Sequence, residues 1–108
     1  MPTCRELGIG QLCLSQIAQG ILTGKYRFGE PFPAGSRATD TDAPYIAGML
    51  TADLLRRVDK LVPLARAADL TMAQMAVAWV LHNENLASAI TGGLPKQVTE
   101  NAAARPRR

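Results

Sequence analysis

The segment Ser15–Tyr26 reads Ser-Gln-Ile-Ala-Gln-Gly-Ile-Leu-Thr-Gly-Lys-Tyr and follows a short apolar run, Ile9–Leu14. An apolar run this short, bounded by glycine, is typical of a buried strand in a parallel sheet. Before it, residues 2–7 resemble the last turns of a helix that Gly8 closes. A helix end, a glycine and a short strand form the αβ half of a βαβ unit, so the sequence predicts an α/β fold.

The middle of the chain is first irregular and then helical. Residues 27–50 carry many glycines and prolines, which predicts a long irregular connection. Connections of this length tend to be functional. Thr51 can cap a helix that runs to about Asp69, and Pro63 is expected to kink it near the middle.

A second helix is expected to begin at Thr71, in a capping box with Gln74. Its buried face is predicted by apolar residues that recur at spacings of three and four, namely Met72, Met75, Ala76, Trp79 and Val80. A second short strand follows at 86–90, and Pro95 suits the first turn of a last helix.

The net charge of +3 does not indicate a nucleic-acid partner. Three basic residues belong to a short basic tail, 105–108, and the basic and acidic side chains of 1–104 balance. A nucleic-acid interface needs Lys and Arg clustered on one surface. We therefore expect no nucleic acid among the partners.

Cys4 and Cys13 show neither metal-type spacing nor a disulfide framework, and we expect both to be small buried apolar residues of a cytoplasmic protein. No secretory signal is recognisable, because Arg5 and Glu6 interrupt the start of the chain. No apolar run reaches the roughly 18 residues needed to cross a bilayer. We expect no membrane partner.

Ser15–Tyr26, together with Pro31–Arg37, resembles the segment after the seventh strand of aldo-keto reductases, where the chain crosses the pyrophosphate of the nicotinamide cofactor. The resemblance continues in order through Leu70–Leu81 and Pro95–Asn101. It implies part of a (β/α)8 TIM barrel, the C-terminal part, with about two short parallel strands plus helices. A complete barrel takes roughly 250 residues. Residues 1–104 would form an NADP(H)-binding fragment of that domain.

The resemblance also implies which residues contact NADP(H). Backbone amides at tight turns and helix N-termini suit phosphate groups. The cofactor-binding residues carried over from the family are Ser15, Ile17, Gln19, Gly20, Lys25, Gly92, Gly93, Lys96, Gln97, Glu100 and Asn101. Without the resemblance, a loop without a ligand and a polar helix face remain open alternatives.

Three positions depart from the family pattern. Leu14 stands where an aromatic ring usually stacks on the nicotinamide, and Gln16 where a proline usually follows the serine. Gly93–Pro95 is one residue short of the family's pattern and lacks the Ser-Arg pair that grips the 2′-phosphate of NADP. Lys96 could supply part of the missing positive charge, as a point charge on a flexible stem.

Carbonyl reduction needs a proton donor for the developing alkoxide. The family takes it from a Tyr-Lys-Asp-His tetrad on the early strands, and no position here matches those motifs, so we assign no catalytic residue and no metal ligand. We expect a truncated aldo-keto reductase that supplies the cofactor side and is inactive alone, with a complementing chain as a candidate partner. The alternatives are a non-catalytic helical interaction module and a gene remnant without activity.

Overall fold

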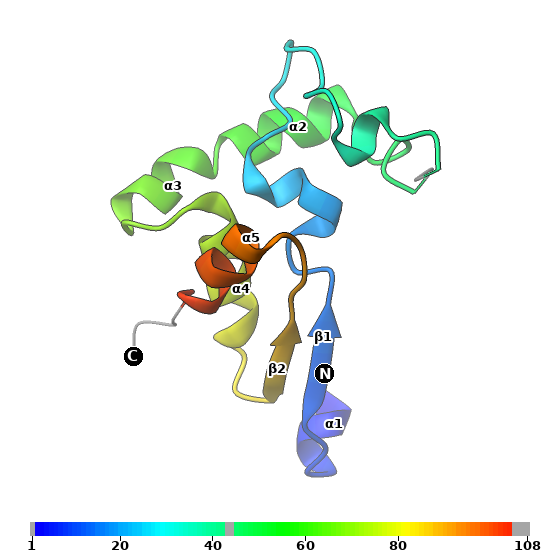
Figure 1. Ribbon diagram of the computed structural model, residues 1–108. Coiled ribbons are helices and arrows are strands. Elements are labelled where there is room, and N and C mark those ends of the chain that lie inside the picture. Colours follow the sequence, from blue (N-terminus) through cyan, green and yellow to red (C-terminus); the bar gives the residue numbers. More distant parts are fainter. Residues whose placement is uncertain (1, 43–44, 105–108) are drawn as a thin grey trace. The chain divides into compact units, whose positions relative to one another are not determined.

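The computed structural model describes residues 2–42 and 45–104 (Figure 1). The expected basic tail, 105–108, lies outside the described residues. The elements in chain order are α1 (Pro2–Glu6), β1 (Gln11–Leu14), the 3-10 helices η1 (Ala18–Thr23) and η2 (Arg37–Thr39), α2 (Ala52–Asp59), α3 (Val62–Ala67), α4 (Met72–Leu81), β2 (Leu86–Ile90) and α5 (Pro95–Ala102).

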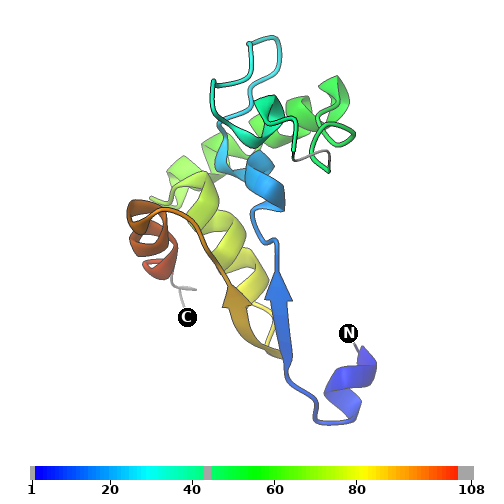
Figure 2. The same ribbon diagram turned by 45° about the vertical axis from the view of Figure 1, so that its right-hand side comes forward.

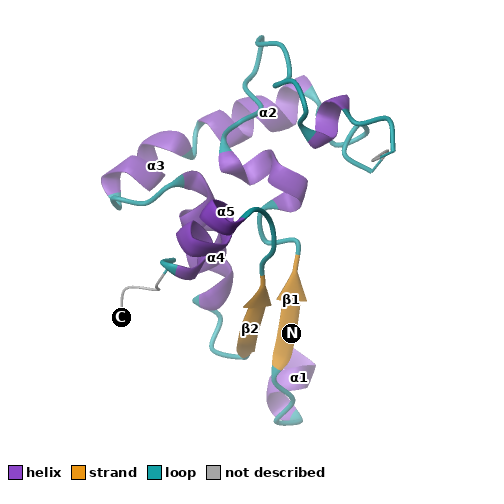
Figure 3. Cartoon of the chain, viewed as in Figure 1, coloured by secondary structure: helices purple, strands orange, loops and turns teal. Residues whose placement is uncertain are grey.

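The chain divides into two compact units. The first holds the residues up to Gln16 and those from Gln74 onward, and the second holds Ile17–Ala73. The first unit is built on a two-stranded parallel sheet of β1 and β2 (Figure 3). In its register, Leu14 lies opposite Ile90. This confirms the two predicted parallel strands. In both ribbon views α4 runs alongside the strands (Figure 1, Figure 2).

A β-bulge separates the two ends of β2. The register shifts between the first two residues of β1, where the partners in β2 jump from Leu86 to Ser88. Ala87 is therefore the extra residue of the bulge. Leu86 is 8% exposed and Ile90 is 56% exposed, although an unbroken strand would place residues four apart on one face. The bulge thus turns Leu86 to the covered side of the sheet.

The other side of the sheet is apolar and exposed. Leu12 and Leu14 alternate along β1 and Ile90 lies opposite Leu14, so the three side chains share one face, which we call the open face. Their exposed fractions are 67%, 73% and 56%. The expectation that Ile9–Leu14 is a fully buried strand is therefore wrong, because the described part of the first unit covers only one face of the sheet.

The two cysteines also differ from the expectation. Cys4 and Cys13 are free thiols of intermediate exposure rather than fully buried. Cys4 Sγ accepts a hydrogen bond from Gln11 Nε2 at 3.1 Å. The described residues therefore leave both thiols partly accessible.

The buried face of α4 matches the predicted one only in part. Met72 and Ala76 of the predicted set are each 8% exposed, whereas Trp79 is 79% exposed. Seven residues make nearly two turns of a helix, so Trp79 lies on almost the same face as Met72 but further along the axis, where the described residues do not cover it. The assignment of Trp79 to the buried face is wrong. α4 begins directly after Thr71 as predicted, and the capping box there stays a prediction.

The second unit replaces the single kinked helix expected over 51–69 by two helices, α2 and α3. Thr51 caps α2 as predicted, since its hydroxyl accepts from the Leu54 amide at 3.2 Å. The chain leaves the helix after Asp59, and Pro63 falls in the first turn of α3. Proline has no amide hydrogen for an interior helical bond, but at a helix start that donor is not needed. The break therefore comes before Pro63.

Tyr26 forms the centre of the second unit. It is 0% exposed, and its ring meets Phe32 edge to face with centroids 5.7 Å apart. Its hydroxyl oxygen accepts from the Ala38 amide at 3.3 Å. These contacts tie down the irregular region predicted for 27–50, whose described residues contain only the short helix η2 as regular structure.

The open face predicts that residues 1–108 are marginally stable or self-associate when purified. An exposed apolar sheet face with unpaired edges favours aggregation. Sedimentation velocity should show concentration-dependent association, which Leu12→Lys should reduce by placing a charge on the open face. A monomer with one sharp thermal unfolding transition would contradict the prediction.

Candidate functional site

The parallel sheet brings two loops to one edge. Ser15 follows β1 directly, and Thr91–Gly93 follow β2 directly (Figure 3). Because the strands are parallel and Leu14 lies opposite Ile90, both loops start at the same carboxyl edge. Loops at this edge carry the ligand sites of α/β folds. The first unit therefore has a candidate site at the carboxyl edge of its sheet.

Ser15 leaves the strand with a left-handed backbone, at φ +63°. This conformation costs a residue with a side chain about 1–2 kcal/mol, and such strain is concentrated at functional sites. The next residue, Gln16, is 7% exposed, and its Nε2 donates to the carbonyl of Cys13. A buried side-chain bond thus closes the turn around Ser15.

The second loop leads into α5 through a turn that requires glycine. Gly93 has φ +139°, and a Cβ added there would lie 3.3 Å from Gln97 Cβ and closer still to Gln97 Oε1. Gln97 Oε1 accepts from the Leu94 amide at 2.9 Å. The missing side chain of Gly93 therefore makes room for Gln97, which caps the helix.

The α5 residues that the family resemblance places at the adenine lie in different environments. Gln97 is exposed and serves as the helix cap, Glu100 is half-buried, and Asn101 is 6% exposed. The three share one helix face, because they lie at spacings of three and four. The Glu100 carbonyl accepts from Gln74 Nε2 of α4 at 3.1 Å, which ties the two helices together. Gln97 thus has a structural role and Asn101 is buried, and the adenine contact stays a prediction.

The second unit holds the remaining predicted residues, in a strained turn. Ala18 and Gln19 are left-handed at φ +47° and +59°, and Gly20 follows at +99°. The amides of Gly20 and Leu22 both donate to the carbonyl of Ile17, at 3.0 and 3.1 Å. Two strained residues with side chains in succession were not expected from the sequence.

Lys25 folds back over Gly20. A Cβ at Gly20 would lie 2.7 Å from Lys25 Cε and 2.8 Å from its Nζ. The ammonium is 5.2 Å from the centroid of the Tyr26 ring, within the range of a cation–π contact. Thr23 Oγ1 donates to the Gly20 carbonyl at 2.6 Å, which fixes the turn below the lysine. Lys25 itself is exposed, so its charge is available to an anion.

The structure brings together part of the expected set. The first unit gathers Ser15, Gly92, Gly93, Lys96, Gln97, Glu100 and Asn101, and the second gathers Ile17, Gln19, Gly20 and Lys25. The sequence missed the side-chain bond of Gln16, although its departure from the family's proline was the available signal. Across residues 2–42 and 45–104, no three His, Cys, Asp or Glu side chains gather as metal ligands.

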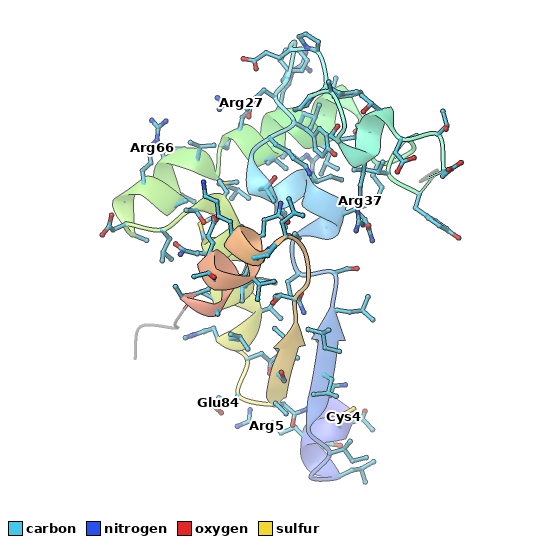
Figure 4. All side chains as sticks on the ribbon, in the orientation of Figure 1. Cys4, Arg5, Arg27, Arg37, Arg66 and Glu84 are labelled. Atoms are coloured by element: carbon cyan, nitrogen blue, oxygen red, sulfur yellow. The ribbon has the colours of Figure 1, made fainter. Side chains whose placement is uncertain are left out.

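The amino edge of the sheet carries a different feature. Arg5 Nη2 lies 3.2 Å from Glu84 Oε2, with side chains 73% and 82% exposed (Figure 4). Exposed ion pairs contribute little stability. The ion pair therefore does not mark a site, and the carboxyl edge remains the candidate site of the first unit.

None of the helices in the described segments is long and apolar enough to cross a lipid bilayer.

The sequence as a whole matches the model of the Aldo/keto reductase family over residues 1–107. The chain belongs to this family. It is 39% identical over 106 residues to a probable voltage-gated potassium channel subunit beta of Arabidopsis thaliana, covering 96% of this chain and 32% of that protein. It is 31% identical over 106 residues to L-glyceraldehyde 3-phosphate reductase of Escherichia coli O157:H7, covering 96% of this chain and 31% of that one.

The fold is similar to that of a glycerol dehydrogenase from Gluconobacter oxydans, an aldo-keto reductase barrel, with a TM-score of 0.69 at 22% identity. That similarity covers 92% of this chain and 30% of the dehydrogenase. The aldo-keto reductase chain thus spans about a third of the length of its relatives. The expected α/β fold, part of the family's barrel, is confirmed.

Replacing Gly93 should disturb the α5 cap. Gly93→Ala combines an unfavourable φ with a clash against Gln97, whereas Gly92→Ala meets no atom within 4 Å. We expect Gly93→Ala to lower the free energy of unfolding by about 1–2 kcal/mol in urea titrations. Gly92→Ala is the matched control and should change it little. Equal values for the two variants would contradict this account of the turn.

Replacing Gly20 should displace Lys25. Gly20→Ala meets Lys25 Cε and Nζ, while Gly29→Ala has a similarly positive φ of +77° and open space around it. The control therefore carries the backbone strain without the contact. In NMR spectra, the Lys25 Cε and Hε resonances should lose the ring-current shift from Tyr26 in Gly20→Ala only. An unchanged shift in Gly20→Ala would show that Lys25 does not rest on Gly20.

Proposed function

We propose that this chain forms the nicotinamide-cofactor side of an aldo/keto reductase barrel and contributes phosphate-binding groups but no proton donor. The observation that carries the proposal is the parallel pairing of β1 with β2, which starts the Ser15 and Gly92 loops at one carboxyl edge. Family membership adds that aldo/keto reductases generally use nicotinamide cofactors. Two similar proteins are named as an L-glyceraldehyde 3-phosphate reductase and a glycerol dehydrogenase.

The donors at this edge suit an anionic group. The first turn of α5 supplies the positive end of the helix, and Lys96 lies exposed in that turn. The strained turn at Ser15 adds a hydroxyl at the same edge. We propose that Ser15, Gly92, Gly93 and Lys96 hold the phosphates of NADP(H), with Gln97, Glu100 and Asn101 toward the adenine.

The turn of the second unit is proposed as a phosphate contact in its own right. Ile17, Gln19, Gly20 and Lys25 form a glycine turn with an exposed ammonium folded against it. Bound NADP(H) would supply the hydride for carbonyl reduction, and these residues would bind and orient it. The cofactor assignment for this turn comes from the family resemblance.

The adjacent residues Lys25 and Tyr26 do not form a suitable proton donor for carbonyl reduction. Lys25 and Tyr26 are adjacent, but Tyr26 is 0% exposed and its hydroxyl accepts the Ala38 amide. The Lys25 ammonium lies over the Tyr26 ring, 5.2 Å from its centroid. We therefore propose that the chain alone does not turn over aldehydes.

We also propose a cytoplasmic location, which the free thiols of Cys4 and Cys13 support.

We propose that the chain binds the 2′-phosphate of NADP(H) weakly. Leu94, 70% exposed, stands near the position where the family has a hydroxyl and a guanidinium, and Lys96 is the one basic residue of α5. A lysine provides charge without the bidentate geometry of arginine. The chain should therefore distinguish NADPH from NADH only slightly.

A non-catalytic interaction module is the second candidate function. Two exposed apolar side chains on helices favour it, Trp79 at 79% on α4 and Leu64 at 59% on α3. Exposed aromatic residues are common anchors of protein interfaces. The relatives named as potassium channel beta subunits are described as parts of assemblies, which agrees with this candidate.

Titration with NADPH and NADH, followed by cofactor fluorescence, separates the candidates. We expect saturable binding of both, a preference for NADPH of less than about tenfold, and loss of that preference in Lys96→Met. The ion-pair residue Arg5, at the amino edge, gives the matched control Arg5→Met. Absence of binding by the wild-type chain would favour the interaction module, and aldehyde turnover would contradict the missing proton donor.

A further inference from the structure

We infer that Gln16 is a positioning residue that holds Ser15 in its left-handed conformation at the carboxyl edge of the sheet. Gln16 is 7% exposed, and its Nε2 donates to the carbonyl of Cys13. This bond spans the turn that contains Ser15. The effect of Gln16 on the cofactor rests on the function proposed above, whereas its effect on the turn does not.

The turn needs such a constraint. Ser15 has φ +63°, a conformation that residues other than glycine adopt only when their surroundings impose it. Backbone bonds close the neighbouring turn, where two amides donate to the Ile17 carbonyl, but Ser15 is enclosed by the side-chain bond from Gln16 to Cys13. The strain at Ser15 is therefore balanced by a buried amide group.

Proline at position 16 could not do the same. A proline forces the preceding residue toward extended backbone, because its ring clashes with that residue. The left-handed Ser15 and a proline at 16 therefore disfavour each other. Gln16 leaves Ser15 free to turn and restrains it through a hydrogen bond instead.

The turn leaves Ser15 exposed at the edge that it shares with the Gly92 loop. Gln16 is buried and acts through Ser15, without meeting the ligand itself. Loss of the Gln16 bond should therefore weaken cofactor binding while leaving the sheet intact.

Gln11, at the other end of β1, provides a matched control. Its side chain is also partly buried and donates to a sulfur, Cys4 Sγ, but it lies at the amino end of β1. Gln16→Met and Gln11→Met make the same chemical change at opposite ends of the strand. Gln16→Glu is a second test variant, which keeps the shape of the side chain and removes the amide donor.

The experiment uses the full chain, uniformly labelled with ¹⁵N and ¹³C. Without cofactor, Gln16→Met and Gln16→Glu should shift the Ser15 Cα and Cβ resonances toward extended values, and Gln11→Met should not. In NADPH titrations, both Gln16 variants should bind about tenfold more weakly, since one buried hydrogen bond is lost. Gln11→Met should bind like the wild type.

The outcomes separate this inference from the proposed function. If the wild-type chain does not bind NADPH, the proposed function fails, and the Ser15 resonances alone decide the role of Gln16. Unchanged Ser15 resonances in the Gln16 variants would overturn the inference. So would wild-type NADPH affinity in the Gln16 variants of a chain that binds NADPH. If Gln16→Met does not fold, Gln16→Glu is read by the same two criteria.

Discussion

The parallel hydrogen bonding between β1 and β2 is the constraint on which the first unit depends. It joins segments from the two ends of the chain and sets the register that places Leu14 opposite Ile90. From that register follow the shared carboxyl edge, with Ser15 and Gly92 at its start, and the open face on the other side of the sheet. The same pairing therefore creates both the candidate phosphate site and the main liability of the isolated chain.

Local patterns predicted most of the elements and failed where packing decides. The strands could be predicted because each is a short apolar run near glycine, and Thr51 was identified as a cap by its place before an amphipathic run. Trp79 was misassigned because the spacing places it on nearly the same face as Met72, which is buried, and does not tell how far along α4 that face is covered. Only the segments that pack against each turn of the helix determine this. That information is not local.

At the candidate site, too, the sequence predicted some features and not others. Its glycines and Lys25 could be found from the family pattern, and the structure gives a physical reason for two of them, since Gly20 and Gly93 leave room for Lys25 and Gln97. The left-handed Ser15 was not predictable, because nothing in a serine indicates a positive φ. The sequence marked the position only through the unusual residue beside it, Gln16.

The proposed binding of nicotinamide-cofactor phosphates at the carboxyl edge of the sheet can be tested by mapping the backbone amide shifts of the ¹⁵N-labelled chain during a titration with NADPH. Amides of Ser15, Gly92, Gly93 and Lys96 should shift along one saturating curve. Shifts confined to the amino edge around Arg5 and Glu84, or to the exposed side of α4 at Trp79, would contradict the claim.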